Sequence, residues 1–220
     1  MWYWLFSWFV KITGWIGKVL FFRTKIYYEN KKIQGRHIKG KAILFSNHLS
    51  IYDVAVMLFV FRTRTLRCLV AEIMFQKNPL FTFFLKSLGA IKVDRNSLDF
   101  SFISKSCDIL DKGGVIEIYH DARLPLPNEQ TPLPFKPSMV YMALKSGAPL
   151  IPVYTNGKYF QKERAKVIIG TPIDARALFD ENLPKRENLK VISEILRNKI
   201  IELGNELDRQ TNNHKTKERK

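Results

Sequence analysis

Cysteine is scarce in this chain of 220 residues, where only Cys68 and Cys107 occur, each within an apolar segment. The four histidines form no cluster, and the two cysteines lack the close spacing of a metal site. This composition argues against a disulfide framework and against a zinc site, and it fits a reducing compartment. The sequence also lacks internal repeats and an interdomain linker, so its length predicts one domain with a full core.

Acidic residues are the second shortage. Twenty Asp and Glu stand against 36 Lys and Arg, which gives a net charge of +16 and a pI near 9.9. A surface of this charge attracts nucleic acid, anionic lipid or acidic substrates, and charge alone does not choose among them. We find no nucleic-acid-binding motif and therefore expect no nucleic-acid partner.

The N-terminus favours an anionic membrane surface as the partner. All four tryptophans lie within the first fifteen residues, and tryptophan concentrates where an apolar body meets a wet edge. Ser7, Lys11, Gly14 and Lys18 recur at spacings of 4, 3 and 4, which places them in one narrow stripe of a helix. We predict that residues 1–28 form an amphipathic, monotopic membrane anchor on the cytoplasmic face, whose lysines reach anionic headgroups.

Other interpretations of the N-terminal segment fit less well. A spanning helix would bury two lysines near the membrane centre, at a cost of about 2.5–3.5 kcal/mol each. A signal peptide needs a basic residue before the apolar run and a small-residue cleavage site after it, and the sequence has neither. The remaining alternative is a core helix of the domain, which the density of tryptophan disfavours.

Residues 29–208 predict an α/β domain with a mostly parallel, mixed sheet flanked by helices, because short β-rich runs alternate with longer helical patterns. Residues 24–35 predict two short strands around a turn, and residues 209–220 predict a basic, disordered tail. The expected strands lie at 41–46, 66–71, 89–93, 114–119, 149–155 and 166–170, and the expected helices at 53–62, 79–88, 97–113, 137–147 and from 188 onward.

The stretch FSNHLSIYDVAV, residues 45–56, places His48 after an apolar strand and Asp53 at the start of the next helix. A helix cap and a turn residue would explain the two side chains without any function. However, a carboxylate that accepts from one imidazole nitrogen fixes the tautomer and leaves the other nitrogen as a base. The neighbouring serines do not indicate a hydrolase, because a nucleophile elbow needs glycines that FSNHLS lacks.

Three motifs give the chain a family resemblance. NHLSIYD resembles the first motif, N-H-x-x-x-x-D, of the glycerolipid acyltransferases typified by lysophosphatidate acyltransferase. GAIKVDR, residues 89–95, resembles their second motif, and PLIPVYTNG, from Pro149, resembles the fourth. The resemblance implies transfer of a fatty acyl group from acyl-CoA or acyl carrier protein to a lysolipid hydroxyl, 1-acylglycerol-3-phosphate above all, in phospholipid synthesis. His48 and Asp53 are then the catalytic residues, and no cofactor is implied.

The third motif departs from the family. Where members carry Phe-Pro-Glu-Gly-Thr-Arg, residues 118–123 read IYHDAR, which keeps Arg123 and puts His120 and Asp121 at the glutamate and glycine positions. We expect Arg123 to contact the acceptor's anionic group, and His120 to contact a headgroup that lacks phosphate. A metal site that joins this pair to the first motif is not expected, because catalytic zinc needs three well-placed protein ligands.

A second departure lies at Glu72, where many members carry a lysine near the acceptor phosphate. An anion in place of a cation makes a phosphate pocket less favourable, and Arg95 and Lys92 remain as further expected phosphate partners. The acceptor can therefore be a phosphate-bearing or a neutral lysolipid. Two other functions stay open from the sequence: a thioesterase that gives the acyl group to water, and a non-enzymatic basic membrane-binding module.

Overall fold

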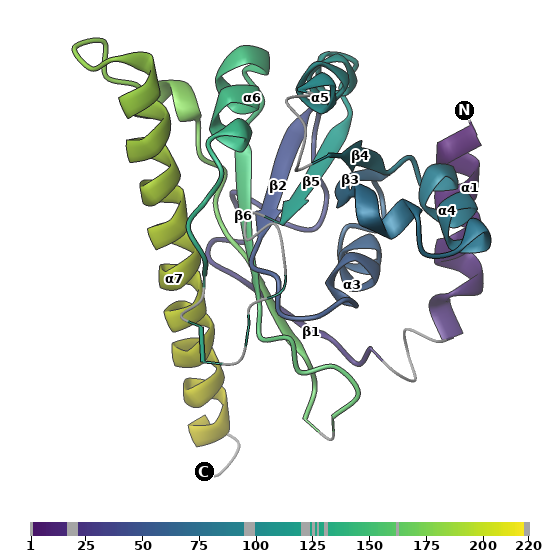
Figure 1. Cartoon of the computed structure of the whole chain (residues 1–220). Helices are drawn as coiled ribbons and strands as arrows, with labels where there is room; N and C mark the ends of the chain where they lie inside the picture. The colour runs from purple at the N-terminus through teal and green to yellow at the C-terminus, as the bar shows by residue number, and fades with distance from the viewer. Residues whose placement is uncertain are drawn as a thin grey trace.

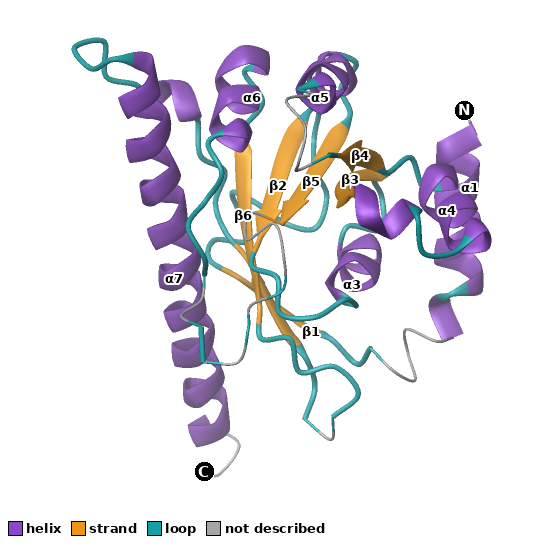
Figure 2. Cartoon of the chain, viewed as in Figure 1, coloured by secondary structure: helices purple, strands orange, loops and turns teal. Residues whose placement is uncertain are grey.

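The computed structural model describes residues 2–16, 22–94, 100–119, 124, 126, 128–129, 132–161 and 163–217, the last four through their backbone alone. In this part of the chain a single seven-stranded sheet forms the centre of the molecule (Figures 1 and 2). Its order is β1-β7-β6-β2-β5-β3-β4, and all neighbours are parallel except the pair β6–β7. The strands are β1 (Lys25–Tyr28), β2 (Ala42–Ser46), β3 (Leu66–Ala71), β4 (Ile91–Val93), β5 (Val115–Tyr119), β6 (Leu150–Thr155) and β7 (Lys166–Ile169).

Helices cover both faces of the sheet, as the alternating sequence pattern predicts (Figure 1). One face carries α5 (Ser101–Asp111), α6 (Ser138–Ser146) and α7 (Lys185–Lys217). The other carries α3 (Asp53–Val60), α4 (Pro79–Ser87) and α1 (Trp2–Thr13), and two short 3-10 helices, η1 (Glu72–Phe75) and η2 (Ala175–Leu178), complete the described elements.

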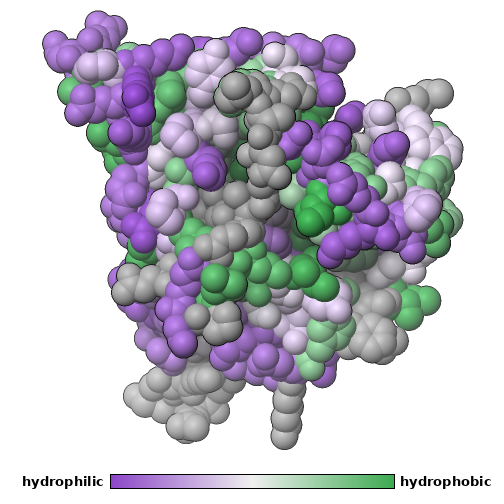
Figure 3. All heavy atoms as spheres, in the orientation of Figure 1, coloured by the Kyte–Doolittle hydropathy of each residue, from purple (hydrophilic) through white to green (hydrophobic). Residues whose placement is uncertain are grey.

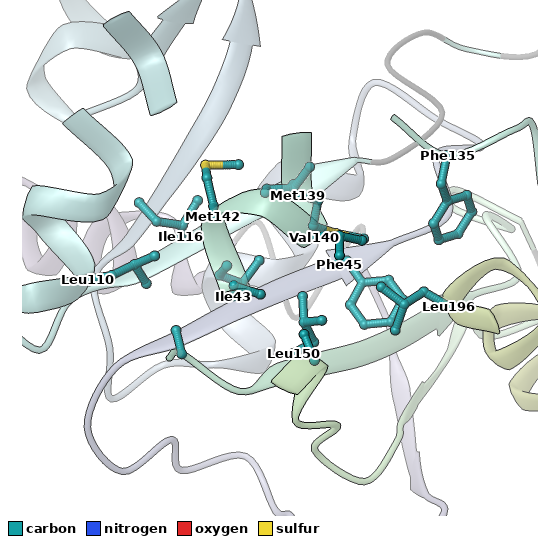
Figure 4. Packing of buried hydrophobic residues seen from close by; sticks show 14 of the residues in the cluster. Ile43, Phe45, Leu110, Ile116, Phe135, Met139, Val140, Met142, Leu150 and Leu196 are labelled. Carbon is teal, nitrogen blue, oxygen red and sulfur yellow. The ribbon is translucent and has the colours of Figure 1, made fainter. Parts of the chain in front are cut away.

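The core lies on both sides of the sheet because the central strands are apolar on both faces. On β2, Ile43 and Phe45 point toward α5, α6 and α7, whereas Leu44 between them points toward α3. Figure 4 shows the first side, where Phe45 lies near Leu196 of α7. Parallel strands buried on both faces read as continuous hydrophobic runs, which is why the sequence located β2 to β7 within a few residues.

Local signals set the helix ends. The side chain of Asn78 caps α4 by accepting from the backbone N–H groups of Leu80 and Phe81, and Pro79 occupies the first turn. Gly147 ends α6 in the left-handed conformation, with φ of 64°.

The region 24–35 differs from the two strands expected from its sequence. It holds one strand, β1, which pairs in parallel with β7, and a turn closed by the Asn30 carbonyl follows. Glu29 does not form a hairpin turn, because its carboxylate accepts from Thr171 and pairs with Lys199. Residues 25–28, assigned from sequence to the membrane segment, therefore belong to the α/β domain.

The C-terminal helix is longer than the sequence predicts. It extends through Lys217, so residues 209–217 are helical where a disordered tail was expected. Two features explain part of this extension. The Gln210 amide donates a hydrogen bond to the Tyr28 carbonyl, and the Thr211 side chain is buried. Tertiary packing thus outweighs the polar composition of this segment.

The N-terminal helix α1 presents its polar stripe to the protein, contrary to the expectation that its lysines face lipid headgroups. Ser7 and Lys11 are buried, and Lys11 donates to the carbonyls of Arg62 and Arg64 at 3.1 and 2.6 Å. Backbone carbonyls satisfy the ammonium there, which allows the helix to dock through polar groups. Lys18 lies outside the described residues.

The opposite side of α1 is apolar and exposed, and Figure 3 shows pale and green spheres over this helix. No helix in the described ranges is long and apolar enough to cross a membrane. The exposed side chains on this side are Trp2, Trp4, Leu5, Trp8, Phe9 and Ile12, followed by Trp15 and Ile16 beyond the helix end.

Candidate active site

The carboxyl ends of three parallel strands place the candidate site. β2 lies between β5 and β6, so the residues that end or follow these strands meet at one edge of the sheet. His48 follows β2, Tyr119 ends β5 and Thr155 ends β6. The fold thus brings together side chains that are far apart in the sequence.

His48 and Asp53 are in contact, as their spacing predicts. The Nδ1 of His48 lies 3.0 Å from the Oδ2 of Asp53, and this aspartate is fully buried while the histidine side chain is 18% exposed. The same Oδ2 accepts from the backbone N–H groups of Leu49 and Ser50, at 2.9 and 2.8 Å. These bonds run back to the loop before α3, so Asp53 fixes the loop that carries His48 and does not act as a helix cap.

The other oxygen of Asp53 accepts from the hydroxyl of Tyr159 at 2.6 Å. Burial, and then the charge of Asp53, raises the pKa of Tyr159, so its phenol stays a donor at all ordinary pH values. The Tyr159 oxygen also lies 2.8 Å from the hydroxyl of Thr155. Hydrogen bonds therefore hold both oxygens of the Asp53 carboxylate.

Asn47 joins the loop to β6. Its amide nitrogen donates to the carbonyl of Thr155 at 2.8 Å, and its amide oxygen accepts from the backbone N–H of the same residue at 2.9 Å. Asn47 is buried, so these two hydrogen bonds also satisfy a polar side chain inside the protein. The asparagine of the first motif thus has a structural role beside the His48–Asp53 pair.

An aromatic ring supports the imidazole. The ring of Tyr119 lies against that of His48, with centroids 4.5 Å apart and planes inclined at 35°. The Tyr119 hydroxyl donates to the buried carboxyl group of Glu117 at 2.5 Å. His48 is therefore held at Nδ1 by Asp53 and across its ring by Tyr119.

Together these contacts leave the imidazole in a defined tautomer. With the Nδ1 proton directed at Asp53, Nε2 is the basic nitrogen, and an imidazole so oriented can accept a proton from a substrate hydroxyl. This geometry agrees with the sequence resemblance, and comparison with known proteins extends it.

A model of the acyltransferase family matches residues 25–156, more than half of the chain. The chain belongs to the acyltransferase family. It is 32% identical over 130 residues to the 1-acyl-sn-glycerol-3-phosphate acyltransferase of Bacillus subtilis (strain 168). That alignment covers 57% of this chain and 62% of the relative, so the chain spans less than two thirds of that protein's length.

The fold is also similar to a solved acyltransferase. The crystal structure of the 1-acyl-sn-glycerophosphate (LPA) acyltransferase PlsC from Thermotoga maritima superposes with a TM-score of 0.65. The match covers 90% of this chain and 79% of that one, at 18% sequence identity. The comparison confirms the α/β architecture with a mostly parallel sheet flanked by helices.

Of the residues expected to contact the acceptor, one can be placed. Arg95, Arg123 and His120 lie outside the described residues. Lys92, on β4, forms an ion pair with Glu72 across 2.6 Å, and its side chain is 54% exposed. Glu72 thus neutralises a cation that the sequence assigned to the acceptor phosphate.

A metal site is not formed by the part of the chain that the structure describes, where no three His, Cys, Asp or Glu side chains converge. Asp121, like His120, falls outside that part. The two cysteines are free thiols, and both are buried.

A hollow of about 800 Å³ lies along the edge strand β4, between α1, α4 and α5. The Glu72–Lys92 pair is part of its wall, and three further cations and one further anion, Asp108, line it. The guanidinium of Arg67 lies over the ring of Tyr3, 4.2 Å from the ring centroid. This excess of positive charge suits an anionic ligand. The further cations are Arg67, Lys86 and Lys105.

Tyr159, Tyr119 and Glu117 could not be assigned to the site from the sequence, each for an identifiable physical reason. Tyr159 lies 106 positions after Asp53, so no local spacing connects the two. Tyr119 and Glu117 belong to a strand whose relation to β2 depends on sheet order. A glutamate within the apolar run GVIEIY was the one available signal, because charged residues are rarely buried without a role.

Proposed function

We propose that this acyltransferase moves a fatty acyl group from the thioester of acyl-CoA or acyl carrier protein to a lysophospholipid hydroxyl. The observation that carries the proposal is the His48–Asp53 contact at 3.0 Å within the segment that matches the family. The acceptor that fits best is 1-acylglycerol-3-phosphate, the compound in the name of the Bacillus subtilis relative, and the cationic hollow beside β4 supports an acidic substrate.

The reaction follows from the orientation of His48. Its Nε2 takes the proton of the acceptor hydroxyl while that oxygen attacks the thioester carbonyl carbon. Asp53 stabilises the imidazolium that forms, because its carboxylate faces Nδ1. When the tetrahedral intermediate collapses, the carbon–sulfur bond breaks and the imidazolium returns the proton to the departing thiolate. These steps need no bound metal or cofactor.

The direct test uses purified full-length protein, acyl-CoA and a panel of lysolipids, with products followed by mass spectrometry. We expect acylated lysolipid in the wild type and a loss of at least about 10²-fold in His48→Ala. Free fatty acid without acylated lipid would instead indicate a thioesterase. Near-normal transfer by folded His48→Ala protein would refute the assigned base.

We also propose that α1 attaches the enzyme to a membrane through its exposed apolar side, and not through its lysines. Monomeric soluble proteins rarely expose an apolar patch of this density, and tryptophan is enriched at bilayer interfaces. Attachment would bring the site to a lysolipid acceptor that resides in the bilayer. The thioester donor and the free cysteines favour the cytoplasmic face.

A further inference from the structure

Glu117 is a carboxylic acid in the middle of the sheet. It lies within β5, opposite Leu44 of β2 and Cys68 of β3, and its exposed fraction is 2%. Its Oε1 accepts from Tyr119, whereas its Oε2 has no hydrogen-bond partner among the described residues. An apolar residue would fill this position without the desolvation cost of a carboxyl group. A role beyond packing is therefore needed to explain a glutamate here.

The surroundings of Glu117 are almost wholly apolar. It borders a small cavity of about 20 Å³ whose walls come from α3, β3, α4 and its flanking residues. Among the described residues, the titratable groups that face it are the thiol of Cys68 on β3, the phenol of Tyr119 on β5 and the carboxylate of Asp53 on α3. None of these described groups is a cation. The apolar wall consists of Val54, Leu58, Leu66, Val70, Leu85, Leu88 and Ala90.

This environment favours the neutral acid. Burial raises the pKa of Glu117 to about 8; the Tyr119 hydrogen bond opposes this effect, and the charge of Asp53 adds to it. Burial also raises the pKa of Tyr119, so the phenol remains the donor in the pair. At neutral pH the two side chains thus form a hydrogen bond without placing a second anion near Asp53.

We propose that Glu117 is a positioning residue for acyl transfer: through Tyr119 it fixes the aromatic ring against which the His48 imidazole lies. The inference rests on the proposed function of His48. Asp53 fixes the imidazole at Nδ1, whereas a ring packed against it fixes the plane of the imidazole. The Tyr119 ring, whose centroid lies 4.5 Å from that of His48, is this packed ring, and Glu117 holds the Tyr119 hydroxyl in place.

The test compares three variants of the full-length enzyme at saturating substrates. Glu117→Leu removes the acceptor and should lower kcat by about 10- to 100-fold, the size of effect that a small misplacement of a catalytic group produces. Glu117→Gln keeps an acceptor oxygen and should retain activity within about threefold of wild type, since its geometry is preserved. Cys68→Ala is the matched control, because it alters the same cavity without touching Tyr119.

A double-variant cycle shows whether Glu117 acts through Tyr119. Tyr119→Phe and Glu117→Leu/Tyr119→Phe should have equal kcat, since the second change removes nothing more once the hydroxyl is lost. The double variant removes both polar partners, so no buried hydroxyl is left without an acceptor. It should therefore be less destabilised than Glu117→Leu alone. Independent, multiplying losses would overturn the proposal.

The dependence of activity on pH distinguishes a positioning role of Glu117 from a packing role, because packing alone would not change it. Above about pH 8 the wild type should lose activity, because ionised Glu117 repels Asp53 and disturbs the apolar surroundings. Glu117→Gln should lack this decline, and an unchanged alkaline limb in that variant would overturn the inference.

Failure of the inference and failure of the proposed function are distinguishable. Full transfer by His48→Ala refutes the function assigned to the dyad. Inactive His48→Ala together with wild-type kcat in Glu117→Leu, or an equal loss in Cys68→Ala, refutes the role of Glu117 alone.

Discussion

The hydroxyl of Tyr159 donates to the Oδ1 of Asp53 at 2.6 Å, which joins two residues 106 positions apart. The loop before α3 holds the other oxygen through its backbone, so the carboxylate that faces His48 is fixed from two independent parts of the chain. A buried carboxylate with this many donors has a single orientation. The direction of the imidazole is thereby set by the fold and not by the loop alone.

Tyr159→Phe should therefore impair catalysis and stability together. Loss of a hydrogen bond to a charged, buried group costs about 1.5–3 kcal/mol, and we expect kcat to fall by about tenfold because Asp53 loses one constraint. Urea unfolding and steady-state kinetics measure both effects. Tyr52→Phe is the control, since Tyr52 packs near the same aromatic group and its hydroxyl has no hydrogen bond in the described part of the chain. Equal behaviour of the two variants would contradict this role.

Asp53→Asn should lower transfer strongly and also destabilise the fold. An amide has one acceptor oxygen, so its NH₂ group must face a donor: the N–H groups of Leu49 and Ser50, or the hydroxyl of Tyr159. We expect a loss of about 1–3 kcal/mol in the free energy of unfolding, the usual cost of an unsatisfied buried group. Calorimetry and kinetics on the same preparation check this. If the stability of the variant were intact, these three donors and the imidazole of His48 would not all contact Asp53 in solution.

Glu117 should give stability a pH dependence of known sign. Its pKa is raised from an ordinary value of 4.5 to about 8 in the folded protein, so the folded state holds the proton more tightly than the unfolded state. Its contribution to stability is then full below about pH 4.5 and is lost as the pH rises to about 8. Glu117→Gln lacks this dependence. The urea midpoint of the variant, relative to that of the wild type, should therefore be higher at about pH 8 than at about pH 5. If the urea midpoints of the two proteins changed with pH in the same way, the raised pKa of Glu117 would be contradicted.

The sequence predicted most of the fold because burial on both faces leaves a strong trace in parallel strands, which appear as short apolar runs between helical patterns. It also predicted the contact of His48 and Asp53, whose spacing is local. It could not predict Tyr119 or Tyr159, because their place in the site depends on sheet order. Likewise, a polar stripe such as Ser7 and Lys11 shows that one side of a helix is more polar than the rest. It does not show whether that side contacts water or protein.

Glu72 should tune the choice of acceptor through Lys92. The pair is partly exposed, so it contributes little to stability, and Glu72→Gln leaves Lys92 without this partner while adding no new charge. If a phosphate binds near this edge of the sheet, the variant should have a lower KM for lysophosphatidate, by about two- to fivefold, in line with the modest energy of exposed pairs. KM for a neutral lysolipid is the control and should not change. Equal effects on both acceptors would place the phosphate elsewhere.

The orientation of α1 leads to a sharp test of membrane attachment. Because Lys11 is turned inward, binding should depend on the outward apolar side chains and survive Lys11→Ala, which removes its bonds to the carbonyls of Arg62 and Arg64. Each exposed large side chain contributes about 1.5–3 kcal/mol when buried in lipid.

We therefore expect the triple variant Trp4→Ser, Phe9→Ser and Ile12→Ser to partition into anionic vesicles roughly a thousandfold more weakly than wild type. Its kcat for a soluble, short-chain lysolipid should remain normal, because these side chains point away from the domain and the site lies at the edge of the sheet. Vesicle sedimentation with parallel kinetics separates the two effects. Equal vesicle binding by the triple variant and the wild type would show that charge, and not the apolar side of α1, holds the enzyme at the membrane. Loss of binding in Lys11→Ala would show instead that docking of the helix is required before the apolar side can insert.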